Sequence, residues 1–129
     1  MSATMERTAY DLLGGEVFLR RLVDRFYDHM ASDADVRTLR EMHAADLGPM
    51  RTRLFEFLSG WLGGPPLYFE RADRKCIVSA HAPFAIDAQA RDEWMTCMRR
   101  ALADTGVEPM LGEAVERALY RFADALRSR

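Results

Sequence analysis

The chain has 129 residues and a formal net charge of −2, with 18 Lys or Arg residues against 20 Asp or Glu residues. Hydrophobic residues make up 49% of it and charged residues 29%, which excludes a disordered chain and permits a core without disulfides. The small net charge argues against nucleic acid or an anionic membrane as a partner. No apolar run reaches the roughly 18–20 residues of a membrane span. We therefore expect a single domain over residues 1–129.

Cysteine usage and the N-terminal residues bear on the compartment. Cys76 and Cys97 are too few for a disulfide framework, and residues 1–6 contain no apolar signal segment. A reducing, cytoplasmic environment is the expectation.

Helical periodicity begins near the N-terminus. A short turn is predicted from Thr8, a suitable N-cap, to Leu13, where Gly14 and Gly15 stop it. The next helix begins at Glu16, and six apolar residues at helical spacing form one stripe along it: Leu19, Leu22, Val23, Phe26, Tyr27 and Met30. Ser32 and Asp33 end this helix, and Val36, Leu39 and Met42 indicate a brief further one.

Pro49 marks the start of another long helix, because proline fits the first turn, where its missing N–H costs nothing. Met50, Leu54, Phe57, Leu58 and Trp61 keep helical spacing until Gly63-Gly64-Pro65-Pro66 ends the helix. Residues 67–86 have no clear period, although Cys76-Ile77-Val78 alone could form a short strand.

Two more helices complete the chain. The first follows the N-cap Asp87 and carries Trp94, Cys97, Met98 and Ala101 on one face. The second opens at Pro109, and its stripe consists of Leu111, Val115, Ala118, Leu119, Phe122 and Leu126. The pattern predicts an all-α fold.

Few residues suggest chemistry. There is no GxGxxG, no phosphate-binding loop and no HExxH, and the two cysteines lack CxxC spacing. The acidic residues are expected to be solvated. Of the three histidines, His29 lies off the apolar stripe and is expected to be exposed. His43, between helices, and His81, in the aperiodic segment, remain as possible ligands.

Four short motifs, in this order and at this spacing, resemble those of group II truncated haemoglobins. They are Arg25-Phe26-Tyr27, Leu54-Phe55-Glu56-Phe57-Leu58-Ser59-Gly60-Trp61-Leu62-Gly63-Gly64-Pro65 with Tyr68, His81-Ala82-Pro83-Phe84, and Arg91-Asp92-Glu93-Trp94. The resemblance runs from about Tyr10 to Asp104. It implies a truncated globin fold, a two-over-two helical sandwich that encloses haem b. Dioxygen or another diatomic molecule would be the ligand, and an unidentified reductase a possible partner.

The resemblance also implies roles for individual residues. His81 is similar to the proximal histidine that binds the iron, and a neutral imidazole suits that role. Tyr27, His43 and Trp94 correspond to a polar distal cage, in which phenol and indole are hydrogen-bond donors. Met50 stands at the distal gate. The other residues implied to contact haem are Arg53 and Tyr68 at the propionates, and Leu54, Phe57, Leu58, Phe84 and Met98 on its apolar sides.

Two positions depart from the family pattern. Ala80 stands where an arginine usually precedes the proximal histidine, and alanine cannot pair with a propionate. Arg74 or Lys75 are candidate substitutes. Met50 replaces a residue that is commonly small, which predicts a narrower gate or a thioether close to the iron.

Several distal donors would slow ligand release, so retention, sensing or redox chemistry is expected rather than oxygen transport. Two other functions remain open. One is a helical interaction module that has lost haem, which the altered residues 73–80 favour. The other is an enzyme that removes peroxide or nitric oxide at the same iron, and that enzyme would need an electron donor.

Overall fold

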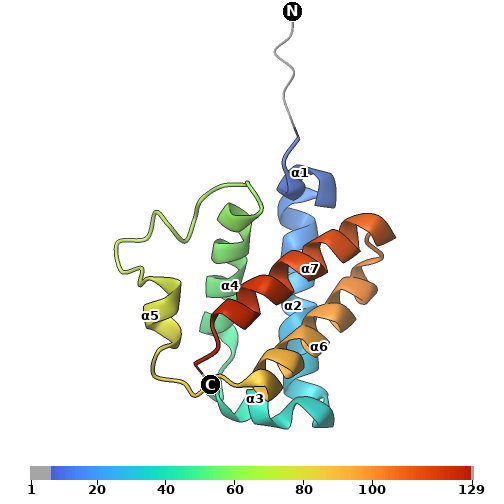
Figure 1. The fold of residues 1–129 in the computed structure, drawn as a ribbon. Helices are drawn as coiled ribbons and strands as arrows, with labels where there is room; N and C mark the ends of the chain where they lie inside the picture. The colour runs from blue at the N-terminus through green and yellow to red at the C-terminus, as the bar shows by residue number, and fades with distance from the viewer. Residues whose placement is uncertain (1–6, 129) are drawn as a thin grey trace, which may run out of the picture.

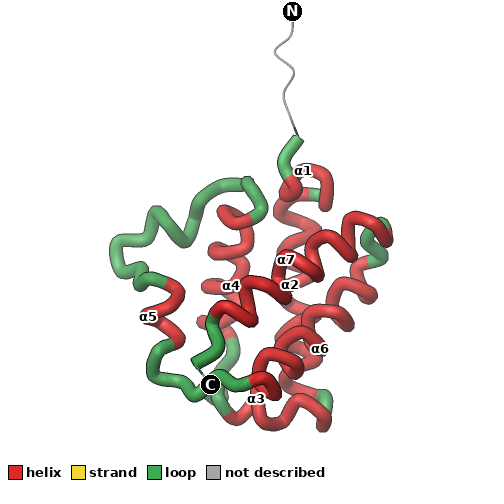
Figure 2. Tube along the Cα trace, in the orientation of Figure 1, coloured by secondary structure: helices red, strands yellow, loops and turns green. Residues whose placement is uncertain are grey.

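A computed structural model describes residues 7–128, apart from the Val78 side chain, and in that range helices are the only regular secondary structure. Their bounds are α1 Ala9–Leu13, α2 Gly15–Ser32, the 3₁₀ turn η1 Ala34–Val36, α3 Arg37–Glu41, α4 Gly48–Trp61, α5 Ile77–His81, α6 Ala88–Thr105 and α7 Pro109–Ala125 (Figures 1 and 2). The predicted all-α class is confirmed. No helix in the described range is both long and apolar enough to cross a membrane.

The predicted starts of the long helices are confirmed to within one residue, since α2 begins at Gly15 and not at Glu16, and α4 begins at Gly48, directly before Pro49. The Thr8 hydroxyl accepts a hydrogen bond from the Asp11 N–H over 3.2 Å, and Gly14 ends α1 with a φ of 118°, which favours glycine. At the start of α6, the Asp87 carboxylate accepts from the Ala90 N–H over 2.9 Å. Pro49 lies in the first turn of α4. Local sequence therefore sets where these helices begin and end.

Two helix pairs make up the body of the molecule. α2 packs against α4, α6 packs against α7, and the contact between α2 and α6 joins the pairs (Figure 1). The α2 stripe predicted from the sequence is buried in full, and it meets Met95, Cys97, Met98 and Ala101 of α6, which have no exposed surface. The core thus lies between the two long helices that carry Tyr27 and Trp94.

The segment before His81 corrects one prediction. Cys76-Ile77-Val78 was expected as a possible short strand, but the five-residue helix α5 begins at Ile77. The Ala80 N–H donates to the Cys76 carbonyl over 2.8 Å, and the described part of the chain offers no strand with which a second one could pair. α5 lies between two long loops beside α4 and has no extensive contact with another helix (Figure 2). His81 is therefore carried by a segment that stands off the core.

Candidate functional site

His81 is the last residue of α5. One of its ring nitrogens makes a hydrogen bond to the backbone, and the other makes none with the described residues. Its Nδ1 lies 2.7 Å from the Ile77 carbonyl oxygen. Because a carbonyl only accepts, Nδ1 carries the proton and donates it, which leaves the Nε2 lone pair available in the neutral ring. Within residues 7–128, Nε2 has no hydrogen-bond partner. A half-buried imidazole with this tautomer fixed by its backbone can bind a metal ion through Nε2.

Tyr27, on α2, is only 5% exposed. Burial raises the pKa of its phenol well above the ordinary value, so the hydroxyl stays protonated. This hydroxyl has no partner among the described residues. Every fully enclosed side-chain nitrogen or oxygen in that range does have one, so the Tyr27 hydroxyl borders a space that a water-sized group can enter. It is a donor without an acceptor.

His43 follows α3 and faces the Tyr27 ring, with the two ring centroids 6.4 Å apart. Burial lowers the pKa of His43 against the opposing effect of its hydrogen bond to the Leu39 backbone, and the positive charge of Arg40 lowers it further. Its Nδ1–H donates to the Leu39 carbonyl over 2.9 Å. The neutral ring therefore presents an unprotonated Nε2, so His43 accepts hydrogen bonds on this side, whereas Tyr27 donates them.

Trp94 projects from α6 toward the same region of α2. Its ring centroid lies 5.1 Å from that of Phe26, and Phe26 in turn makes an edge-to-face contact with Tyr27 at 4.9 Å. The Trp94 indole N–H has no partner in the part of the chain that the structure describes. Phe26 is fully buried and holds both donor-bearing rings. The sequence placed Phe26 on the apolar stripe but gave it no site role.

The residues predicted to contact the apolar sides of haem differ in burial and do not all lie together. Leu58 and Met98 are fully buried, while Met50 and Leu54 are partly buried against the core. Phe57 packs into an aromatic group within the core, with ring centroids 5.9 Å from Tyr68, 6.0 Å from Phe69 and 5.2 Å from Phe122. Phe84 lies apart from all of them, in the loop after α5, and is 42% exposed.

The two predicted propionate contacts are engaged with the loop ahead of α5. The Tyr68 hydroxyl donates to the Lys75 carbonyl over 2.5 Å. Arg53 makes a long ion pair with Asp73, 3.5 Å between nitrogen and oxygen, and its side chain is 40% exposed. Tyr68 thus fixes this loop, while Arg53 is free to exchange its partner.

Sequence reasoning missed two buried or half-buried ionisable groups. Glu93 is 8% exposed, and its carboxylate accepts from the Leu39 N–H and from the Gln89 amide. The signal was available, because Glu93 shares a helical stripe with the apolar residues Ala90, Cys97 and Ala101.

His29, expected to be exposed, is half-buried, which corrects that prediction. Its ring nitrogens lie 2.9 Å from an Asp33 oxygen and 2.7 Å from an Asp104 oxygen. The carboxylate of Asp104, at the end of α6, shields a ring that would otherwise face solvent.

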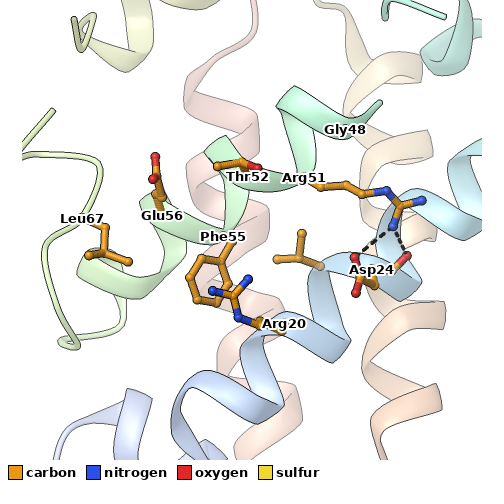
Figure 3. Close-up of a pocket in the computed structure, with 9 residues that line it drawn as sticks. Arg20, Asp24, Gly48, Arg51, Thr52, Phe55, Glu56 and Leu67 are labelled. Carbon is orange, nitrogen blue, oxygen red and sulfur yellow. Dashed lines mark hydrogen bonds and ion pairs between the residues drawn. The ribbon is translucent and has the colours of Figure 1, made fainter. Parts of the chain in front are cut away.

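Neither a cluster of metal ligands nor the hollow beside α4 coincides with the predicted site residues in the described range. No group of three or more His, Cys, Asp or Glu side chains suited to a metal ion occurs among the described residues, so a metal at His81 would have to bring other ligands with it. A hollow of about 340 Å³ lies between α2 and α4 (Figure 3). None of the predicted site residues lines it.

Comparisons with known proteins agree with this arrangement. The model of the bacterial-like globin family matches residues 8–128. The chain is 35% identical to the group 2 truncated hemoglobin YjbI of Bacillus subtilis over 99 residues, which are 77% of this chain and 73% of that protein.

Solved structures match over nearly the whole chain. A cold-adapted truncated hemoglobin from the Antarctic bacterium Pseudoalteromonas haloplanktis superposes with a TM-score of 0.90 and 37% identity, covering 95% of this chain and 99% of the other. A truncated oxygen-avid haemoglobin from Bacillus subtilis gives 0.86 and 31%, covering 95% and 100%.

Proposed function

The chain belongs to the bacterial-like globin family, a membership that implies haem binding, and we propose that it binds haem b through His81 and retains dioxygen or a similar diatomic ligand beside Tyr27 and Trp94. One observation carries this proposal. The Nε2 atom of His81, the Tyr27 hydroxyl and the Trp94 indole N–H all lack partners within residues 7–128, although each belongs to a half-buried or buried side chain. These residues fit the group, since they offer one ligand nitrogen and two hydrogen-bond donors.

His81 has the properties of an iron ligand. The hydrogen bond from Nδ1 to the Ile77 carbonyl fixes the ring orientation and leaves electron density on Nε2. Haem would supply an iron atom that could bind the His81 imidazole and a diatomic ligand. α5 contacts the other helices sparsely, so it can place His81 against a flat group without disturbing the core.

Tyr27 and Trp94 would retain the ligand through charge. Dioxygen held at such a site would carry partial negative charge, and carbon monoxide would carry far less. A phenol and an indole donor that are shielded from water therefore stabilise dioxygen preferentially. Each donor contributes roughly 0.5–1.5 kcal/mol, so the two together slow release by roughly one to two powers of ten. The related Bacillus subtilis protein is described as oxygen-avid, which supports retention.

His43 would pack beside the Tyr27 ring and would not donate a hydrogen bond to the ligand. Its neutral ring presents Nε2 as an acceptor, so it can receive a hydrogen bond but cannot donate one to dioxygen. His43 would then border the polar side of the space around Tyr27, with Met50, Leu54, Leu58 and Met98 as its apolar boundary.

Arg53 is the proposed propionate anchor. Its ion pair with Asp73 is long and solvent-exposed, so little free energy is lost when a propionate replaces the aspartate. Tyr68 already donates its only hydroxyl proton to Lys75, and Ala80 offers no charge. Arg53 is therefore the first candidate for the anchor, ahead of Arg74 and Lys75.

Titration of the haem-free protein with haemin tests the proposal. We expect saturation at one haem per chain and distinct Soret bands for the ferric, ferrous and carbon monoxide-bound forms. Absence of stoichiometric binding would overturn the proposal and favour the haem-free interaction module instead.

A further inference from the structure

Arg51 joins α4 to α2 beside Tyr27. Its Nη1 donates to the Asp24 carbonyl over 2.9 Å and to the Asp24 carboxylate over 3.1 Å. Its Nη2 donates to the Asp28 carboxylate over 2.9 Å. Figure 3 shows Arg51 reaching from α4 across the hollow's rim to Asp24 on α2. One guanidinium thus holds two successive turns of α2.

The same guanidinium lies over the phenol ring. Its central carbon is 5.8 Å from the Tyr27 ring centroid, within the range of a cation–π contact. Asp24, Tyr27 and Asp28 are three and four residues apart, so they share one side of α2. Arg51 touches all three at once, and its ion pairs fix where the positive charge lies relative to Tyr27.

Arg51 also stands next to the distal wall of the proposed site. Met50 precedes it, and Leu54 lies one turn further along α4. The ion pairs of Arg51 therefore hold the α4 segment that carries Met50 and Leu54 against the α2 turn that carries Tyr27.

Arg20 provides a comparison within the same hollow. Its guanidinium lies 4.2 Å from the centroid of the Phe55 ring, but its ion pair is with Glu16 on its own helix. It contacts none of the predicted site residues through a hydrogen bond, ion pair or ring in the described range. Arg20 is thus a cation–π arginine that does not join α4 to α2 by an ion pair.

We propose that Arg51 is a positioning residue for the distal side, which holds the Tyr27 ring so that its hydroxyl meets the diatomic ligand. This inference rests on the proposed function. It predicts that removing Arg51 acts on the ligand only through Tyr27, because the guanidinium is committed to Asp24 and Asp28 and has no other route to the site.

The test uses the carbon monoxide complex of the full chain. Its C–O stretching band reports the donor beside the ligand, and stopped-flow mixing gives the oxygen off-rate. We expect Arg51→Ala to shift the band toward that of Tyr27→Phe and to raise the off-rate several-fold. Arg51→Lys, which keeps the charge but not the paired donors, should recover part of the effect, and Arg20→Ala should match the wild type.

A double-mutant cycle separates positioning from general destabilisation. In a Tyr27→Phe background, Arg51→Ala should change neither the band nor the off-rate further. An unchanged band in Arg51→Ala, or an equal effect in both backgrounds, would overturn the inference while the proposed function stands. A wild-type chain that forms no carbon monoxide complex would overturn both. If Arg51→Ala does not fold, Arg51→Lys decides by the same comparison.

Discussion

The carboxylate of Glu93 accepts a hydrogen bond from the backbone N–H of Leu39 over 2.8 Å, between α6 and α3. The carbonyl of the same Leu39 accepts from Nδ1 of His43. One buried carboxylate, directly before Trp94 in the sequence, therefore fixes the residue from which His43 takes its orientation. Two hydrogen bonds through Leu39 thus connect α6, at the residue before Trp94, with His43.

Removing this carboxylate should cost stability. Glu93→Ala leaves the Leu39 N–H without its partner in a buried position, which costs about 1–3 kcal/mol of unfolding free energy. Glu93→Gln keeps an acceptor oxygen and should cost less. Urea unfolding measures both, with the exposed Glu113→Ala as the control. Equal losses in Glu93→Ala and Glu93→Gln would show that the charge matters and the acceptor does not.

Trp94→Phe should release dioxygen faster. The variant keeps an aromatic ring against Phe26 but lacks the donor, so the oxygen off-rate should rise about tenfold, equivalent to about 1.4 kcal/mol. Carbon monoxide dissociation should change much less, since that ligand carries little charge. Stopped-flow and flash-photolysis measurements give both rates. The matched control is Trp61→Phe, because Trp61 packs against Phe122. If both gases respond equally, Trp94 acts by shape alone.

Arg53→Ala should weaken the hold on haem. Loss of the proposed propionate anchor is expected to speed haem transfer to an acceptor apoglobin several-fold, at unchanged helix content. Arg74→Ala serves as the comparison, since Arg74 was the alternative anchor and donates to the Arg71 carbonyl here. Unchanged transfer in Arg53→Ala together with faster transfer in Arg74→Ala would move the anchor to Arg74.

The cluster around His29 predicts acid sensitivity. Hydrogen bonds from His29 and Arg25 lower the pKa of Asp104, and those from Arg100 and His29 lower that of Asp33 despite the opposing effect of its burial. A lowered folded-state pKa gives stability that is present above the unfolded value, near 3.8, and is lost as the pH falls through the folded pKa. The unfolding free energy should therefore decline below about pH 4.

Asp104→Asn should weaken this decline of the unfolding free energy at low pH. It should also lower the unfolding free energy at neutral pH, because α2 and α6 lose a shared ionic contact. The exposed Asp11→Asn is the control and should keep the wild-type pH dependence. If Asp104→Asn and the wild type lose the same unfolding free energy at low pH, the cluster around His29 is not the cause of the acid sensitivity. Thermal unfolding from pH 3 to 7 is the measurement.

The sequence predicted the long helices well because their signals are local. α2, α4, α6 and α7 each have an apolar stripe, and α6 has in addition the capping carboxylate of Asp87. α5 was missed because five residues do not complete a stripe, and Cys76 at its N-cap makes no side-chain cap. Its β-branched Ile77 and Val78 favoured a strand instead.

Long-range polar contacts could not be predicted. His29 and Asp104 are 75 positions apart, and Leu39 and Glu93 are 54 apart, so no local pattern joins either pair. Motif resemblance supplied Tyr27, His43 and Trp94 as a group, and the structure places the Tyr27 ring by His43 and the Trp94 ring by Phe26. The motif contained no sign that His43 would be an acceptor, which depends on the bond to Leu39.

The central claim, that Nε2 of His81 is the haem ligand, is tested most directly by the ferrous and carbon monoxide absorption spectra of His81→Gly, recorded with and without imidazole. The account predicts that the variant loses the histidine-ligated spectra of the wild type and regains them when imidazole fills the space left by the side chain. His29→Ala, which removes a histidine held by two aspartates, should leave the spectra unchanged. A His81→Gly protein that keeps the wild-type ferrous spectrum without imidazole would contradict the account.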